Sequence, residues 1–255
     1  MIKFENTEVM GWEHAIRGMR NPMNSWSRID SEYCCSGLCG DGGCIGCGQV
    51  NYYIGTNDYK LMMNLAKSGP VHGKYRRMIT VYVDITAPLY WWKEFDTYKV
   101  GTVANSCSTM HKIHAKKFTL EDFSCEHLTK RSLIKLQNDI NELNFWRDAF
   151  SLKTMEDRAS YFASRDWSDT YIPARKECWW QIIQLLPSSY NQKRTVMLNY
   201  EVLAHIYQDR KDHKLDEWAE HKPDWELDTA KPWQFGFCDW IKTLPYSELI
   251  TVEEK

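Results

Sequence analysis

The segment Leu185–Arg210, LLPSSYNQKRTVMLNYEVLAHIYQDR, carries the signals that decide the fold class. Pro187 ends a helix expected over Ala174–Leu186, because proline cannot continue the helical hydrogen-bond pattern. A short strand is expected over Arg194–Leu198, and a further helix begins at Asn199, whose side chain is a preferred N-cap. The apolar residues that should face inward from this helix are Val202, Leu203 and Ile206. A helix, a strand and a second helix in succession indicate an α+β fold.

The sequence on either side of this segment supports the same class. Apolar residues recur with helical spacing between positions 133 and 143, which predicts an amphipathic helix over Ser132–Phe150. Strands and helices do not alternate along the chain, so a Rossmann sheet is not supported. We expect one α+β domain over residues 1–255, with a mixed sheet and a helical layer. The other expected elements are helices over Tyr59–Lys67 and Leu89–Phe95, a strand over Met78–Ile85, and a last helix with Trp233, Phe237, Trp240, Ile241 and Leu244.

Two of these helices have N-terminal signals of their own. Thr56 or Asn57 can cap the helix over Tyr59–Lys67. The tripeptide Thr86–Pro88 combines an N-cap residue with an early proline, and it is therefore expected to open the helix over Leu89–Phe95.

The composition allows a sizeable core and has two unusual features. The chain has 255 residues, of which 43% are apolar and 26% charged, with 32 Lys and Arg against 34 Asp and Glu. A formal net charge of −2 gives no general attraction for polyanions, so we expect no extended nucleic acid as a partner. The unusual features are an aromatic content of 14%, including 12 Trp and 14 Tyr, and nine Cys. Most of the aromatic residues are expected to pack in the core.

The sequence has no segment typical of secretion or of a membrane protein. Residues 1–10 contain charged side chains and no apolar run, unlike a signal peptide. The longest apolar candidate, Ile79–Trp92, is interrupted by Asp84 and Pro88 and is shorter than the roughly 18 residues of a spanning helix. We therefore expect a cytoplasmic protein without a membrane partner.

A Cys- and Gly-rich loop is expected over residues 31–50. Five cysteines lie within SEYCCSGLCGDGGCIGCGQ, and the glycines among them favour turns. Cys44 and Cys47 have the Cys-x-x-Cys spacing of a metal site, and Cys35 and Cys39 could complete a tetrathiolate site for zinc or an iron–sulfur cluster. The alternative is an insertion that tolerates many sequences and whose thiols have no specific role.

Several local signatures of catalysis are absent from the sequence. There is no GxSxG, P-loop, GxGxxG or kinase signature. His111-x-x-His114 would lie on one helical face, but no carboxylate follows at the spacing of a metalloprotease. These two histidines are expected to be polar surface residues.

The segment Leu185–Arg210 resembles the C-terminal signature of the flavin-dependent thymidylate synthases. In that family a Leu-Pro and a strand are followed by Asn-x-x-x-Leu-x-(His/Asn)-Phe and then an Arg. The positions in register here are Pro187, Asn199, Leu203, His205, Ile206 and Arg210. Upstream, Gly69-Pro70-x-His72 and the strand after it are similar to the family's Glu-His segment. The resemblance covers most of the chain in order, omits the Cys-rich loop as an insertion, and implies the fold of that family.

The central signature of the family is altered in this sequence. The Arg-His-Arg positions of the family hold Thr97, Tyr98 and Lys99 here. Its Glu and Ser positions hold Asn105 and Cys107, and two further Arg positions hold Thr109 and Ile183. Of four expected cationic contacts to phosphate, Lys99 alone persists, and each such contact is typically worth about 1.5–3 kcal/mol. The residues that could replace the missing cations are Lys74, Arg76, Arg77 and Lys112.

The resemblance implies an enzyme with FAD bound between the subunits of a homotetramer. Reduced by NADPH, it would transfer a one-carbon unit from methylene-tetrahydrofolate to C5 of a deoxyuridylate-like pyrimidine nucleotide. The implied cofactor-binding residues are His72, Tyr98, Lys99, Asn199 and His205. The implied substrate-binding residues are Glu94, Asn105 and Arg210, and the implied catalytic residues are Arg210 and Cys107.

Two of these residues have specific expected roles. Arg210 would reach the edge of the pyrimidine and stabilise the negative charge that develops on it. The Cys107 thiol, with Lys99 nearby, could attack the base as a nucleophile. The alternative for Cys107 is a small residue in a packed turn.

Three classes of function are compatible with the sequence. The first is a flavin-dependent pyrimidine nucleotide C5 methyl- or hydroxymethyltransferase with an altered substrate requirement. The second is a homologue that binds a nucleotide without catalysis. The third is a metal-stabilised protein-interaction module that uses exposed aromatic side chains.

Overall fold

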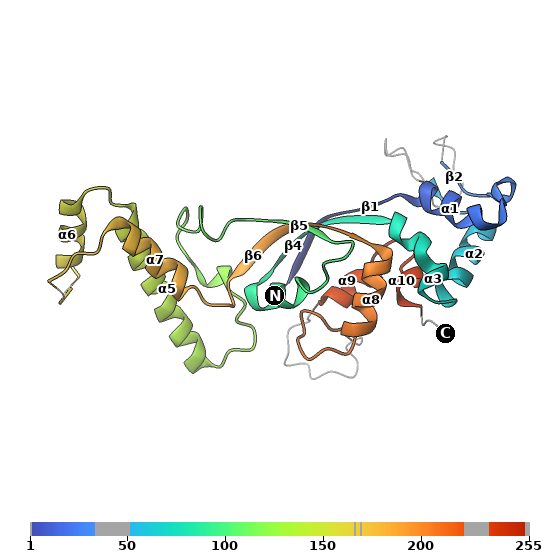
Figure 1. Ribbon diagram of the computed structural model, residues 1–255. Helices are drawn as coiled ribbons and strands as arrows, with labels where there is room; N and C mark the ends of the chain where they lie inside the picture. The colour runs from blue at the N-terminus through green and yellow to red at the C-terminus, as the bar shows by residue number, and fades with distance from the viewer. Residues whose placement is uncertain (1, 34–51, 166, 169, 222–234, 253–255) are drawn as a thin grey trace. The chain divides into compact units, whose positions relative to one another are not determined.

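The computed structural model describes residues 2–33, 52–165, 167–168, 170–221 and 235–252 (Figure 1). The predicted metal ligands Cys35, Cys39, Cys44 and Cys47 lie outside these residues, as does Trp233 of the last expected helix. The Cys-rich loop and its metal site therefore stay predictions.

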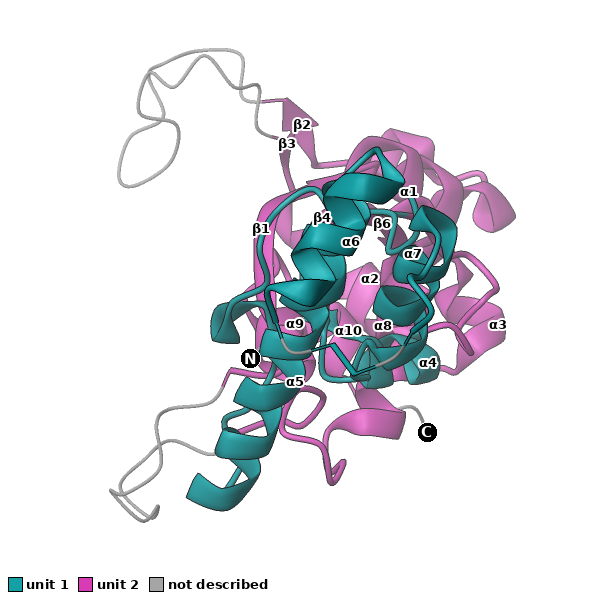
Figure 2. Ribbon diagram, turned by 90° about the vertical axis from the view of Figure 1, so that its left-hand side faces the viewer, with its two compact units in different colours: residues 1, 86–95, 106–194 teal, residues 2–85, 96–105, 195–255 magenta. Residues whose placement is uncertain are grey.

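Contacts within the chain define two compact units, which Figure 2 shows in different colours. Unit 1 comprises Thr86–Phe95 and Ser106–Arg194, and unit 2 comprises Ile2–Ile85, Asp96–Asn105 and Thr195–Lys255. The expected single domain over residues 1–255 stays a prediction.

A four-stranded sheet has the order β1, β4, β6, β5. The strands are β1 (Lys3–Met10), β4 (Thr80–Pro88), β5 (Val103–Ser106) and β6 (Asn191–Asn199). The boundaries between the units fall inside β4, β5 and β6, so each unit contains part of the sheet. Helices combined with a sheet confirm the expected α+β class.

The sheet is antiparallel, and the expectation of a mixed sheet is wrong. The N–H of Tyr200, just after β6, donates to the carbonyl oxygen of Ile79, just before β4, at 3.1 Å. The N–H of Leu89, just after β4, donates to the carbonyl oxygen of Tyr190, just before β6, at 3.0 Å. The strands β4 and β6 thus each end beside the start of the other. These pairings join segments that lie far apart in the sequence, so spacing along the chain does not encode them.

Alternation of buried and exposed side chains defines β4. Val81, Val83 and Ile85 are buried, whereas the Asp84 carboxylate on the other face accepts hydrogen bonds from Asn6 of β1 at 2.9 Å and Thr195 of β6 at 2.6 Å. The expected strand began two residues too early, because residues up to Met78 form a 3₁₀ turn.

The expected helix start at Thr86–Pro88 is wrong, because these residues complete β4 and the helix α4 begins at Leu89. The N–H groups of Leu89 and Tyr90 donate to carbonyl oxygens of Tyr190 and Ser188, both at 3.0 Å. These bonds satisfy two of the N–H groups that the start of α4 leaves without intrahelical partners.

Short helices and turns make up most of the remainder of unit 2. Its α-helices are α1 (Trp12–Arg20), α2 (Thr56–Lys67), α3 (Pro70–Gly73), α8 (Tyr200–Arg210), α9 (Phe237–Lys242) and α10 (Glu248–Thr251). Its 3₁₀ helices are η1 (Asn21–Met23), η2 (Trp26–Arg28) and η3 (Lys74–Met78). The strands β2 (Glu32–Tyr33) and β3 (Tyr52–Tyr53) form a separate antiparallel pair.

The N-terminus of α2 is capped from another part of the chain. The Asp30 carboxylate accepts from the N–H of Asn57 at 2.8 Å and from the N–H of Asp58 at 2.9 Å. Burial acts to raise the pKa of Asp30, but these two hydrogen bonds and one with the Asp58 side chain outweigh it and lower the pKa. Thr56 and Asn57 are thus not the caps that local sequence predicts.

Unit 1 is mainly helical, and its core lies where α5 packs against α6 and α7 (Figure 1). The expected helices over Ser132–Phe150 and Ala174–Leu186 are confirmed within two residues at each end. The elements are α4 (Leu89–Phe95), η4 (Leu120–Asp122), α5 (Lys130–Ser151), α6 (Met155–Ala163) and α7 (Arg175–Leu185). The core residues of α5 include Leu136, Ile140, Leu143 and Trp146. No helix in the described ranges is long and apolar enough to cross a membrane.

His111 and His114 lie in turns of unit 1, so the expected shared helical face is wrong. The Ser108 hydroxyl accepts hydrogen bonds from the N–H groups of Met110 at 3.2 Å and His111 at 2.9 Å. A serine that bonds to nearby backbone groups stabilises a turn in place of a helix. His111 is exposed as expected, whereas His114 is half-buried.

Candidate functional site

Arg210 and Tyr98 meet in unit 2 although they lie far apart in the sequence. Nε of Arg210 donates to the Tyr98 hydroxyl at 2.8 Å, and that hydroxyl donates to the Asp209 carboxylate at 3.3 Å. Nη1 of Arg210 lies 2.8 Å from Nε2 of His213, and its guanidinium carbon lies 5.0 Å from the centre of the Trp218 ring. We call these five residues the Arg210 cluster. Arg210 and Tyr98, which the resemblance predicts as site residues, thus lie in one polar and aromatic cluster.

The chemistry of the Arg210 cluster suits a flat ligand with carbonyl groups. Trp218 is fully buried and Tyr98 is half-buried. Burial raises the pKa of Tyr98, and this effect outweighs the opposing one of Arg210, so the phenol stays protonated at neutral pH. A guanidinium beside aromatic faces keeps its charge and has five N–H donors in a planar fork. Such a group can bind the carbonyl edge of a pyrimidine.

Asn199 is fixed by the start of α8. Its side-chain oxygen accepts from the N–H of Glu201 at 3.1 Å and from the N–H of Val202 at 3.0 Å, which confirms the predicted N-cap. Gly101 lies close to its amide, with a φ of 76°, and a Cβ at that position would be 2.7 Å from Nδ2 of Asn199. Glycine is therefore required at position 101 both by conformation and by space. A contact of Asn199 with a flavin stays a prediction.

Three further predicted residues of unit 2 are exposed. His205 lies on α8, Lys99 lies just after Tyr98, and Asn105 lies in β5. The contacts described for the Arg210 cluster do not include them. Their roles in binding cofactor or substrate stay predictions.

The predicted residues Cys107 and Glu94 belong to unit 1. The Cys107 N–H donates to the carbonyl oxygen of Lys193 at 2.9 Å, and its own carbonyl accepts from Gln192 at 2.7 Å, so the backbone extends the pairing of β5 with β6. The thiol is free and exposed, so the alternative of a packed turn is wrong. Glu94 is half-buried on α4. The roles of both side chains stay predictions.

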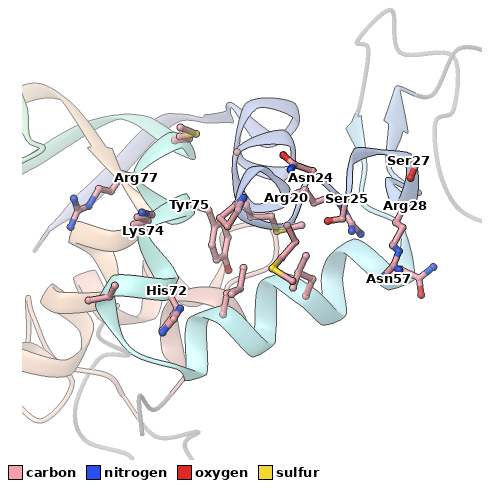
Figure 3. A pocket seen from close by; sticks show the side chains of 18 residues that line it. Arg20, Asn24, Ser25, Ser27, Arg28, Asn57, His72, Lys74, Tyr75 and Arg77 are labelled. Carbon is pink, nitrogen blue, oxygen red and sulfur yellow. The ribbon is translucent and has the colours of Figure 1, made fainter.

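A cavity of about 1440 Å³ lies in unit 2 and contains His72 (Figure 3). Figure 3 shows Ser27, Arg28 and Asn57 at one end and His72 and Lys74 at the other. The other lining residues are Gly18, Met19, Arg20, Pro22, Met23, Asn24, Ser25, Leu61, Leu65, Val71, Tyr75, Arg77 and Met78.

The cations of this cavity differ in their partners. Arg20 forms an ion pair with buried Asp58 at 2.6 Å, and Arg77 pairs with Glu201. Arg28 and Lys74 form no ion pair with any described residue. Positive charge is therefore present toward both ends of the cavity.

The residues of the cavity fit a phosphate-bearing ligand with flat rings. Ligand pockets typically measure about 300–1000 Å³, so this volume holds an extended molecule. Lys74 and Arg28 can bind phosphate, and Tyr75 and Leu61 supply apolar contact area. Arg76, a predicted replacement for a missing phosphate contact, is instead buried and donates to the carbonyl oxygens of Gly73 and Leu249.

Across the described ranges, no three His, Cys, Asp or Glu side chains come together as a metal site. The predicted zinc or iron–sulfur site concerns the cysteines that lie outside these ranges.

Several residues of the candidate site carry no signal in the sequence. Trp218 and Arg28 belong to no motif, and only the folded chain shows their contacts. His213 lies three residues after Arg210, a spacing that places two side chains near each other at a helix end and could have suggested the pair.

Comparison with known proteins gives a distant structural likeness. Two crystal structures of the flavin-dependent thymidylate synthase ThyX from Helicobacter pylori, both with FAD and dUMP, are similar to this chain. One has a TM-score of 0.48 at 11% identity and covers 84% of this chain and 86% of that chain; the other has a TM-score of 0.48 at 12% identity, with coverage of 83% and 86%. No protein-family model and no curated protein matches the sequence. At this identity and TM-score, neither the activity nor the ligands of the Helicobacter proteins transfer to this chain.

Proposed function

We propose that this chain is a divergent flavin-dependent pyrimidine deoxynucleotide C5 methyl- or hydroxymethyltransferase that uses a folate one-carbon donor. The hydrogen bond between Arg210 and Tyr98 carries the proposal. In the resemblance to flavin-dependent thymidylate synthases, these residues occupy two separate signature segments. Their direct contact supports a role for both residues in one site.

Arg210 recognises the pyrimidine in this proposal. The Tyr98 hydroxyl and His213 orient its Nε and Nη1, and the guanidinium is proposed to donate to a carbonyl oxygen of the base. A fixed cation stabilises the negative charge that develops on the base during reaction at C5, because a pre-oriented charge needs little reorganisation. The remaining proposed roles follow the resemblance: Cys107 is the nucleophile, Lys99 is a phosphate contact, and Glu94 and Asn105 are substrate contacts.

The cavity beside His72 is the proposed flavin site. Lys74 would hold the pyrophosphate of FAD, and His72 and Tyr75, which line the same cavity, would contact the remainder. Asn199 and His205 are further proposed flavin contacts. When bound, the flavin supplies the redox chemistry of the one-carbon transfer, with NADPH as reductant and methylene-tetrahydrofolate as donor. The protein is proposed to act as a homotetramer.

Lys74→Ala tests the flavin site directly. We expect the dissociation constant for FAD to rise by about 10- to 100-fold, because a charge-assisted phosphate contact is typically worth about 1.5–3 kcal/mol. The measurement is quenching of FAD fluorescence by the full chain. Lys67→Ala is the matched control, since Lys67 is an exposed lysine of unit 2 that does not line the cavity. Equal affinity of the two variants would place the flavin elsewhere.

A nucleotide-binding homologue without catalysis is the second candidate. The observation that favours it is the altered signature, in which Thr97, Thr109 and Ile183 occupy positions where the family has arginine. A nucleotide-binding homologue would use the Arg210 cluster in the same way as the transferase, but it would form no product.

A further inference from the structure

A group of basic side chains surrounds His114 in unit 1. The basic side chains are Lys112 from the turn after β5, Arg147 from α5 and Arg175 from α7, and the Phe150 ring of α5 lies beside them. We call Lys112, His114, Arg147, Phe150 and Arg175 the His114 cluster. It shares no residue with the Arg210 cluster or the cavity, whose residues all belong to unit 2.

Backbone carbonyls and aromatic contacts orient the two arginines. Nε of Arg147 donates to the carbonyl oxygen of His114 at 3.1 Å, and Nε of Arg175 donates to the carbonyl oxygen of Phe150 at 2.9 Å. The guanidinium carbon of Arg175 lies 4.3 Å from the centre of the Phe150 ring, and this ring lies 4.6 Å from the His114 ring. Arginines from two helices thus lie beside the same pair of rings.

The charge of the His114 cluster is only partly compensated. Asp148 pairs with Arg147 at 2.8 Å, but Lys112 and Arg175 form no ion pair within the described ranges. The hydrogen bonds from Arg147 and Arg175 to carbonyl oxygens each use one N–H group and do not neutralise the positive charge of the guanidinium. Burial lowers the pKa of His114, and Arg175, Lys112 and Arg147 lower it further in that order, whereas no carboxylate acts on it. The imidazole is therefore neutral at pH 7 and lies in a positive field.

A hydrogen bond and helix packing hold the surroundings of the His114 cluster in place. Nε1 of Trp179 on α7 donates to the carbonyl oxygen of Met110 at 3.1 Å and so holds the turn against the helix. The helices α5 and α7 pack against each other in the core of unit 1. Nδ1 of His114 is buried and has no hydrogen-bond partner in the part of the chain that the structure describes. The site has fixed cations, an unused polar atom and little acidic charge.

We propose that the His114 cluster binds the phosphate group of a small anionic ligand. The planar fork of Arg175 matches phosphate oxygens, and Lys112 and Arg147 add positive charge. The ligand is inorganic phosphate or the phosphate of a nucleoside monophosphate, which share this chemistry. The inference goes beyond the proposed flavin function, because it concerns residues that neither the flavin cavity nor the Arg210 cluster includes.

The imidazole of His114 is the reporter in the test. Histidine NMR signals of the full chain are followed against pH, with and without inorganic phosphate at constant ionic strength. Bound phosphate shields the imidazole from the three cations, so we expect the pKa of His114 to rise when phosphate is added. An unchanged His114 titration in saturating phosphate would overturn the proposal, as would an equal phosphate-induced rise in the Arg175→Ala variant.

Variants and nucleotides complete the test. Arg175→Ala should weaken phosphate binding at least tenfold, and Arg175→Lys should have a smaller effect because charge is kept but the fork is lost. Arg165→Ala is the matched control, since Arg165 is an exposed arginine of unit 1 that lies over the Tyr161 ring. It should leave binding unchanged, and equal losses in Arg165→Ala and Arg175→Ala would overturn the proposal.

Two further titrations show whether the site takes the phosphate of a nucleoside monophosphate. We expect dUMP to raise the pKa of His114 and deoxyuridine to leave it unchanged. A response to deoxyuridine would overturn the proposal. Because none of these titrations contains flavin, their failure is distinguishable from failure of the flavin proposal.

Discussion

Arg210→Ala is expected to weaken dUMP binding by about 10- to 100-fold, because a hydrogen bond from a guanidinium to a ligand oxygen is worth about 1.5–3 kcal/mol. Arg210 ends α8, and Tyr98 and His213 hold two of its nitrogens at 2.8 Å. The alanine variant therefore removes an oriented charge as well as a donor. Calorimetric titration of dUMP into the full chain measures the effect.

Two further variants define what the Arg210 result means. Tyr98→Phe removes only the hydroxyl that orients Arg210, so we expect a smaller loss of affinity than in Arg210→Ala. Arg17→Ala is the matched control, since Arg17 is an exposed arginine of unit 2 outside both the cavity and the Arg210 cluster. Unchanged dUMP affinity in Arg210→Ala would contradict the register on which the proposed function rests.

Asp58→Ala is expected to lower the free energy of unfolding by about 3–5 kcal/mol, because it leaves a buried cation without its partner. Asp58 is fully buried and its Oδ1 accepts from Nε of Arg20 at 2.6 Å. Its Oδ2 accepts from the Ser31 N–H at 3.0 Å and the Ser31 hydroxyl at 2.7 Å. Urea unfolding of the variant and the parent measures the difference.

The control for Asp58→Ala removes the aspartate of an exposed ion pair. Asp139→Ala breaks the pair with Lys135 one helical turn away, and we expect a loss of about 0.5 kcal/mol or less. Adding Arg20→Met to Asp58→Ala should restore part of the stability, because it removes the buried charge left unpaired. A loss in Asp58→Ala as small as that in Asp139→Ala would show that the buried pair is not needed for stability.

Elements with local signals were predictable from the sequence. The helix α5 has an apolar stripe that includes Leu136, Ile140 and Leu143, and the N-cap of α8 is the Asn199 side chain. The strand β4 is β-branched and alternates between buried and exposed residues. In each case the residues that decide the structure are neighbours along the chain.

Features that depend on distant residues were not predictable. The strand β1 has no fully buried residue, so it lacks the alternation that marks β4. The cap of α2 comes from Asp30, and the direction of β6 follows from pairing with β4. In the candidate site, the sequence resemblance singled out Arg210 and Tyr98, but their hydrogen bond and the contact with Trp218 arise only in the fold.

The mass of the nucleotide product tests the proposed C5 transfer most directly. The full chain is incubated with FAD, NADPH, methylene-tetrahydrofolate and dUMP, and the nucleotide is analysed by mass spectrometry. We predict addition of a methyl or hydroxymethyl group to the pyrimidine, absent when FAD is omitted and absent in Arg210→Ala. Unmodified dUMP from protein that binds both FAD and dUMP would contradict a transferase and favour the nucleotide-binding homologue.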